Sequence, residues 1–161
     1  MRIHFTTIVY RLAVACWLGG AALFTFILTP AIFREYSRDI AGGIVGTLFP
    51  GYFLWGLTCG LIALVCHGIS PERRSLAPTL ILLIMLVIAS AQAFIIEPRA
   101  AQLKKEIGSF ETTAADHPLR VQFRKLHGIS AAGNLAVVAC GTLLIVLLPQ
   151  GSRRKEGGYL S

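Results

Sequence analysis

The chain alternates between four long apolar stretches and more polar connections. Apolar residues dominate 7–29, 51–68, 76–96 and 128–148, and Arg11 is the one charged residue within the first stretch. A helix needs about 20 apolar residues to cross a hydrocarbon core about 30 Å thick, and lipid offers its backbone groups no other partners. We therefore predict four membrane-spanning helices that form one domain, an all-α, antiparallel four-helix bundle.

The composition also indicates an integral membrane protein. Of the 161 residues, 55% are hydrophobic and 14% are charged, whereas about 25% of residues are charged in a typical soluble domain. Fifteen Lys and Arg against eight Asp and Glu give a formal net charge of +7. The basic residues lie between the apolar stretches or at the chain ends, which is typical of contact with anionic lipid headgroups. We expect the lipid bilayer as a partner and no nucleic acid.

An even number of spans places both termini on the same side of the membrane. The basic residues of that side lie in short segments near the span ends, at 2, 11, 73–74 and 153–155. Those of the other side are spread over two longer connections that also carry acidic residues. The positive-inside rule therefore favours cytoplasmic termini, and we expect 150–161 to be a basic, flexible tail.

Both connections on the other side contain helical patterns. In 30–50, apolar residues recur every fourth position from Ile40, which predicts an amphipathic helix leading into the second span. In 97–126, an early helical pattern and the start signal at Pro118 predict a helical hairpin that extends spans three and four on the periplasmic side. A solvated loop of no chemical importance is the alternative for 97–126.

Each predicted span carries one hydrogen-bonding side chain at a similar depth. With a rise of about 1.5 Å per residue, Thr25, Thr58, Gln92 and Asn134 lie about 6–10 Å inside the same membrane boundary. Polar groups are costly in a bilayer and are often functional there. The alternative is interhelical hydrogen bonding that fixes the packing.

The fourth span adds further polar residues on one face. His127, Ser130 and Asn134 follow one another at helical spacing, and Glu97 lies at the same boundary on the preceding span. We therefore expect a polar pocket that opens on the periplasmic side, with Glu97 and His127 at its mouth and Gln92 with Asn134 at its floor. Such a pocket suits a cation, a small polar ligand or a water chain that relays protons.

A second group of residues lies near the opposite boundary. His4 and His67 belong to different spans, and Cys66 is next to His67. A histidine pair on two helices is a candidate haem or copper site, whereas interfacial histidines without a ligand are the alternative. The four cysteines all lie in apolar stretches, where a free thiol behaves as a small apolar group. We expect no cofactor.

Glycines at Gly19, Gly20, Gly56 and Gly60 are predicted to pack helices, because small residues let helix backbones approach closely. The alternative is that glycine is merely frequent in membrane helices. If these faces are outward, they favour a homo-oligomer or a larger membrane complex.

Three blocks carry a resemblance to a known family. They are WLGG at 17–20 with PAIF at 30–33, the segment 41–53 ending in LFPGYF, and FRKLHGIS at 123–130 followed by Asn134. In these blocks the chain resembles the small bacterial membrane proteins grouped as domain of unknown function 4149, which are similar to eukaryotic transmembrane protein 205. The resemblance implies four spans and an inner-membrane location, and it suggests the handling of soft metals.

The sequence contains no nucleophile elbow, phosphate-binding loop, dinucleotide-binding glycine pattern or HExxH motif. An enzyme is therefore not favoured. Our first hypothesis is non-enzymatic handling of an ion, a metal or a small molecule through the polar pocket. The alternatives are a structural or assembly subunit of a membrane complex and a haem-binding membrane oxidoreductase.

Overall fold

The computed structural model describes residues 2–69 and 76–147, with side chains from Phe5 onward. This part of the chain is helical apart from one short turn and one loop. The elements are α1 (Arg2–Ala22), the π-helix η1 (Leu23–Leu28), α2 (Thr29–Glu35), α3 (Arg38–Ile69), α4 (Leu76–Ala91), the π-helix η3 (Gln92–Ile96), α5 (Glu97–Ile107) and α6 (Pro118–Val146). The tail predicted at 150–161 lies outside the described residues.

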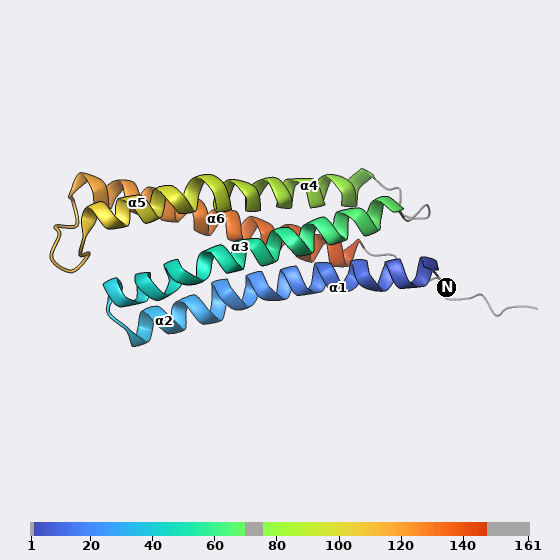
Figure 1. Ribbon diagram of the computed structural model, residues 1–161, viewed down its shortest axis with the longest axis horizontal. Helices are drawn as coiled ribbons and strands as arrows, with labels where there is room; N and C mark the ends of the chain where they lie inside the picture. The colour runs from blue at the N-terminus through green and yellow to red at the C-terminus, as the bar shows by residue number, and fades with distance from the viewer. Residues whose placement is uncertain (1, 70–75, 148–161) are drawn as a thin grey trace, which may run out of the picture.

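These elements form four long rods that pack side by side (Figure 1). The first rod joins α1, η1 and α2, the second is α3, the third joins α4, η3 and α5, and the fourth is α6. Contacts run from α1 to α3, from α3 to α4, from α4 to α6 and from α6 back to α1. The all-α, four-helix architecture is therefore confirmed.

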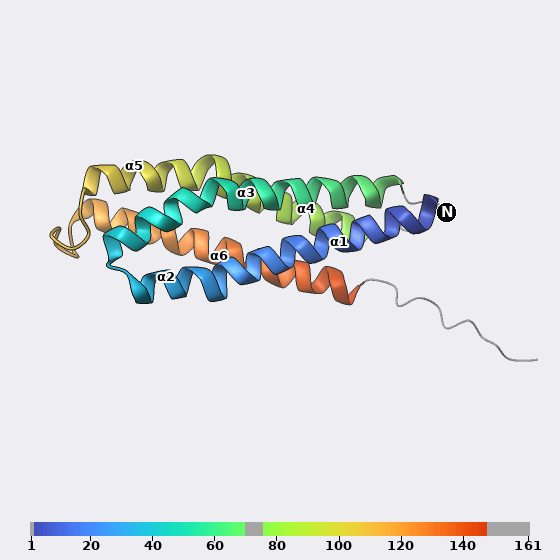
Figure 2. The same ribbon diagram turned by 60° about the horizontal axis from the view of Figure 1, so that its bottom comes forward.

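The two ends of the bundle differ. The N-terminus and the end of α6 lie at one end, here called the terminal end (Figures 1 and 2). The turn between α2 and α3 and the loop 108–117 lie at the other, here called the loop end (Figures 1 and 2). Neighbouring rods in the chain thus run in opposite directions.

All four rods are long and apolar enough to cross a membrane. They span Phe5–Glu35, Arg38–Ile69, Leu76–Ile107 and Pro118–Val146. Only 22–28% of the apolar window in each rod is buried inside the bundle. Large apolar side chains such as Leu54, Trp55 and Phe94 face outward, each more than half exposed. An outer surface of this kind belongs in lipid, and the chain is a multi-pass membrane protein with four candidate spans. Where the membrane boundaries cross the rods remains a prediction.

Two rods widen into a π-helix that ends two residues before a proline. The N–H of Thr29 bonds to the carbonyl of Phe24, and that of Glu97 bonds to Gln92, five residues back. Pro30 and Pro98 follow these residues. A proline ring clashes with the carbonyl four residues earlier, and a wider turn relieves the clash. One π turn shifts the face of the following helix by roughly 100°, so η1 and η3 set which side of α2 and α5 faces inward.

Trp17 of α1 lies at the centre of the packed core. Its indole is 3% exposed and covers two glycines of α3. A Cβ added at Gly56 would lie 2.8 Å from the indole Nε1, and one at Gly60 would lie 2.4 Å from Cζ3. Contacts below 3.0 Å require a neighbour to move, so these two glycines make room for a ring rather than for another backbone.

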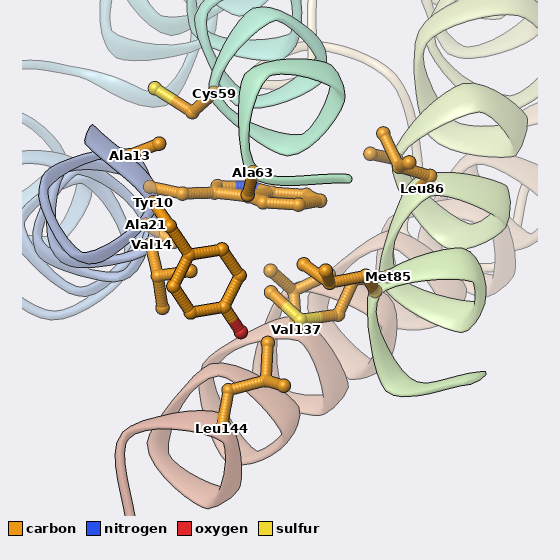
Figure 3. Close-up of a cluster of buried hydrophobic side chains, with 13 residues drawn as sticks. Tyr10, Ala13, Val14, Ala21, Cys59, Ala63, Met85, Leu86, Val137 and Leu144 are labelled. Atoms are coloured by element: carbon orange, nitrogen blue, oxygen red, sulfur yellow. The ribbon is translucent and has the colours of Figure 1, made fainter. Parts of the chain in front are cut away.

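The rest of the core comes from all four rods. The labelled side chains converge on one cluster in Figure 3: Tyr10, Ala13, Val14 and Ala21 of α1, Cys59 and Ala63 of α3, Met85 and Leu86 of α4, and Val137 and Leu144 of α6. Of the other two glycines predicted to pack helices, Gly20 lies near the Trp55 indole, at 3.2 Å for an added Cβ. A Cβ added at Gly19 would meet nothing within 4 Å.

Candidate functional site

A cavity of about 780 Å³ lies at the loop end. There the bundle divides into two helix pairs, α2 with α3 and α5 with α6, and the cavity lies between them. Small residues create the space: Gly42, Gly43 and Gly46 line it from α3, and Ala100 and Ala101 line it from α5. Glycine and alanine project little or nothing from the helix surface, so the two walls stay apart.

Three of the five predicted site residues line this cavity. Glu97 contributes from the start of α5, and His127 and Ser130 contribute from α6. Gln92 and Asn134 do not line it. They are buried deeper in the bundle, at 2% and 7% exposure.

Ser130 connects the cavity to the buried polar residues. Its hydroxyl donates to Gln92 Oε1 over 2.9 Å. Gln92 is the first residue of η3. A Cβ added at Gly133 would lie 3.0 Å from Gln92 Nε2. Gly133 thus makes room for the Gln92 amide, which sequence reasoning did not detect.

Asn134 has a partner on α3. The Tyr52 hydroxyl donates to Asn134 Oδ1 over 3.2 Å, and the Tyr52 ring stacks on Phe24 with centroids 4.4 Å apart. Tyr52 follows Phe49-Pro50-Gly51 and looks like an interfacial aromatic residue in the sequence. The sequence does not show which face of α3 is turned toward α6, so the contact between Tyr52 and Asn134 is visible only in the structure.

The two threonines of the expected polar layer are placed differently. Thr58 is exposed, and its hydroxyl donates to the Leu54 carbonyl of its own helix over 2.8 Å. Thr25 lies in η1 with its hydroxyl oxygen buried. Thr25 is near Tyr52, the partner of Asn134, whereas Thr58 faces away from this polar group although it lies at a similar depth.

The charge of the cavity is dominated by basic residues. Five basic side chains line it against the single carboxylate of Glu97, and they are Arg38, Lys104, Lys105, Arg120 and Arg124. Among the described residues, none of the five forms an ion pair with a carboxylate within 4 Å. In the sequence these residues look like topology signals in two loops, and the fold collects them around one space.

Two of these basic groups are held in place by their neighbours. Lys104 reaches from α5 to α3, where a Cβ added at Gly42 would lie 3.5 Å from its Nζ. The Arg120 guanidinium donates to the Thr113 carbonyl and lies 5.7 Å from the centre of the Phe110 ring. Neither group forms an ion pair within the described part of the chain, and the charge of Asp39, at the edge of the cavity, acts on Lys104.

The outer edge of the cavity is tied together by Asp39, in the first turn of α3 and before the span predicted at 51–68. Its carboxylate accepts from the Ser109 hydroxyl at 2.5 Å and from the Phe110 N–H at 2.7 Å. These two hydrogen bonds hold the pKa of Asp39 below its ordinary value. The loop 108–117 is therefore fastened to α3 by a charged acceptor.

The candidate metal residues lie at the terminal end. His67 is buried at 4% exposure, with its ring 5.8 Å from that of Tyr10, and Cys66 is half-buried. The side chain of His4 lies outside the described part. Over 2–69 and 76–147, no group of three or more His, Cys, Asp or Glu is placed to hold a metal ion.

Comparisons with known proteins give a family. Residues 12–109 match the family described as Domain of unknown function (DUF4149). A protein of Aquifex aeolicus (strain VF5), described as "Uncharacterized protein", is 30% identical over 133 residues, which cover 81% of this chain and 89% of that protein. No solved structure matches the chain.

Proposed function

The chain belongs to the DUF4149 family, and from this premise we propose that it is a non-enzymatic membrane protein that binds and handles a small molecule in the loop-end cavity. The observation that carries the proposal is the cavity itself. It has a volume of about 780 Å³, within the range of about 300–1,000 Å³ that small-molecule sites occupy. Its walls come from all four rods and combine apolar surface with a few polar groups, as ligand sites do.

The buried polar group below the cavity supports this role. Ser130 belongs to both, since it lines the cavity and donates to Gln92. Tyr52 and Asn134 join α3 to α6 at the next level. We propose that these bonds hold the inner end of the cavity at a fixed width while a ligand enters and leaves.

We further propose that the protein lies in the inner membrane with both termini in the cytoplasm and the cavity toward the periplasm. Rods of 29–32 residues are about 44–48 Å long at 1.5 Å per residue, against a hydrocarbon core of about 30 Å. The surplus supports an extension of the third and fourth rods beyond the membrane. Reporter fusions test the orientation: a fluorescent protein fused to either terminus should fluoresce, and alkaline phosphatase there should stay inactive. The reverse pattern would contradict the orientation.

A glycine substitution tests the binding function. Gly46 lines the cavity, and a Cβ added there meets nothing within 4 Å, so Gly46→Leu fills the space without a backbone clash. Gly19→Leu is the matched control, because Gly19 also has open space but lies outside the cavity. The full chain is extracted in a mild detergent and examined by native mass spectrometry. We expect a bound small molecule on the wild type and on Gly19→Leu, and little or none on Gly46→Leu.

Two results would overturn the proposed function. One is a wild-type protein that carries no bound molecule. The other is equal occupancy of the wild type and Gly46→Leu, since a ligand bound outside the cavity would not be affected by this substitution.

A further inference from the structure

We infer that the ligand of the loop-end cavity is an anionic, acyl-bearing lipid. Its headgroup lies among Lys104, Arg38 and Arg124, and its acyl chain lies on Phe49 and Ile96. This inference rests on the proposed function, and it adds the chemical class of the ligand. It follows from the way in which charge, aromatic surface and depth are arranged along the cavity.

The basic residues gather toward the outer part of the cavity. Arg38 begins α3, Lys104 and Lys105 lie in the last turn of α5, and Arg120 and Arg124 lie in the first turns of α6. All of these positions are near the loop end. The five basic groups outnumber Glu97 in the cavity and Asp39 at its edge. An excess of cationic groups around one space attracts an anion, and Lys and Arg bind phosphate and carboxylate groups well.

The inner part of the cavity combines an apolar wall with the polar side chains of Glu97, His127 and Ser130. Phe49 and Phe53 of α3 stack with centroids 5.4 Å apart, and Ile96 and Leu126 face the same space from the third and fourth rods. Phe53 is only 4% exposed and lies behind this wall. The half-buried Phe49, Ile96 and Leu126 supply the apolar surface that a ligand can cover. A purely hydrophilic anion, such as free phosphate, gains nothing from this surface, whereas an acyl chain buries apolar area on it.

Glu97 fixes the direction in which such a molecule lies. It is seven residues before Lys104 on α5, which corresponds to about 10 Å along the helix, and it lines the same cavity. Its carboxylate repels an anionic headgroup from the inner half. The headgroup is therefore attracted outward by Lys104 and repelled inward by Glu97.

The same charges argue against a metal cation. Glu97 and His127 are the metal-binding side chains among the lining residues, and five basic groups surround them. A cation would meet net repulsion, and the two ligands are fewer than the three or four protein groups usual for transition metals.

Matched ligands and matched charge variants test the inference. The purified full chain, freed of bound lipid by detergent exchange, is titrated with palmitoyl-lysophosphatidylglycerol, palmitoyl-lysophosphatidylcholine and inorganic phosphate, and binding is followed by native mass spectrometry. We expect the anionic lysolipid to bind at one site per chain and about tenfold more tightly than the zwitterionic lysolipid. Both carry a phosphate, but the choline cation of the zwitterionic one is repelled by the surrounding basic groups. Inorganic phosphate should not bind measurably.

The variants locate the contact. Lys104→Gln should weaken binding of the anionic lysolipid about tenfold. The zwitterionic one should be weakened less, because the loss of Lys104 also removes its repulsion of the choline cation. Lys104→Arg should restore binding of the anionic lysolipid. Lys125→Gln is the control, because Lys125 is exposed on α6 and does not line the cavity. It removes the same charge and should have no effect beyond twofold.

The outcomes separate this inference from the proposed function. If Gly46→Leu abolishes binding of both lysolipids but the wild type and Lys104→Gln show no preference for the anionic one, the cavity is a ligand site and the inference about charge is wrong. Tight binding of inorganic phosphate alone would also overturn it, in favour of a soluble anion. If both lysolipids bind Gly46→Leu as well as the wild type, the lipid site lies elsewhere and the inference fails.

Discussion

Single glycines decide where the large side chains of this bundle lie. Gly56 and Gly60 admit the Trp17 indole between the first two rods, and Gly133 admits the Gln92 amide between the third and fourth. Gly46 instead faces an open cavity. The same residue type thus provides close packing in one half of the molecule and empty space in the other, according to what the opposing helix presents.

The packing glycines can be tested against an open one. Gly60→Ala places a Cβ 2.4 Å from Trp17 Cζ3 and 2.6 Å from Leu86 Cδ2. The indole is buried and rigid, so we expect a loss of about 1–3 kcal/mol in the free energy of unfolding. Gly19→Ala should be neutral or slightly stabilising, since it adds helix propensity in open space. Unfolding in mixed micelles measures both variants, and equal stabilities would contradict the assigned packing.

The hydrogen bond between Tyr52 and Asn134 can be measured by itself. Tyr52→Phe keeps the ring that stacks on Phe24 and removes the donor to Asn134 Oδ1. Interhelical hydrogen bonds in membranes contribute about 0.6 kcal/mol on average, and we expect a destabilisation of this size. A double-mutant cycle with Asn134→Ala should return the same coupling energy. A coupling near zero would show that the two side chains act independently.

Two prolines affect how whole helices are oriented, and the hydropathy pattern does not reveal this effect. Pro30 and Pro98 follow the π-helices η1 and η3, and the extra residue in each π turn rotates the following helix. This rotation brings Glu97, Ala101 and Lys104 to the cavity face of α5. A regular α-helix continued past Gln92, with 3.6 residues per turn and no π turn, would place these three residues on a different face of α5. The existence of the helix was therefore predictable, and its inward face beyond Gln92 was not.

The attachment of the loop 108–117 to α3 should depend on pH, because it is made by the carboxylate of Asp39. Because the pKa of Asp39 is lowered in the folded protein, its hydrogen bonds contribute stability above its ordinary pKa of 3.8, and that contribution is lost as the pH falls through the lowered value. We expect the protection factor of the Phe110 amide to be constant above about pH 5 and to fall as the pH is lowered from about 4 to about 2. In Asp39→Ala the protection should be low throughout this range. Equal pH dependence in the variant and the wild type would exclude Asp39 as the cause.

At the scale of the whole molecule, the bundle has a solid half and a hollow half. Four apolar stretches predicted four rods, because lipid permits few other structures for such a sequence. The sequence also placed Glu97, His127 and Ser130 near one boundary, and they line one cavity. It did not predict that Arg38 and Arg124, from two separate connections, border that cavity. Their meeting depends on how the rods pair at the loop end, and charge counts along the chain contain no such information.

The two tryptophans differ in exposure, and their fluorescence can therefore be distinguished by a quencher in the lipid. Trp17 is 3% exposed and Trp55 is 52% exposed on the outer surface of α3. In vesicles containing brominated lipids, collisional quenching should remove the emission of Trp55 and spare that of Trp17. Trp17→Phe should therefore leave a strongly quenched protein, and Trp55→Phe should leave a weakly quenched one. Fluorescence then reports separately on the bilayer around the bundle and on the core within it.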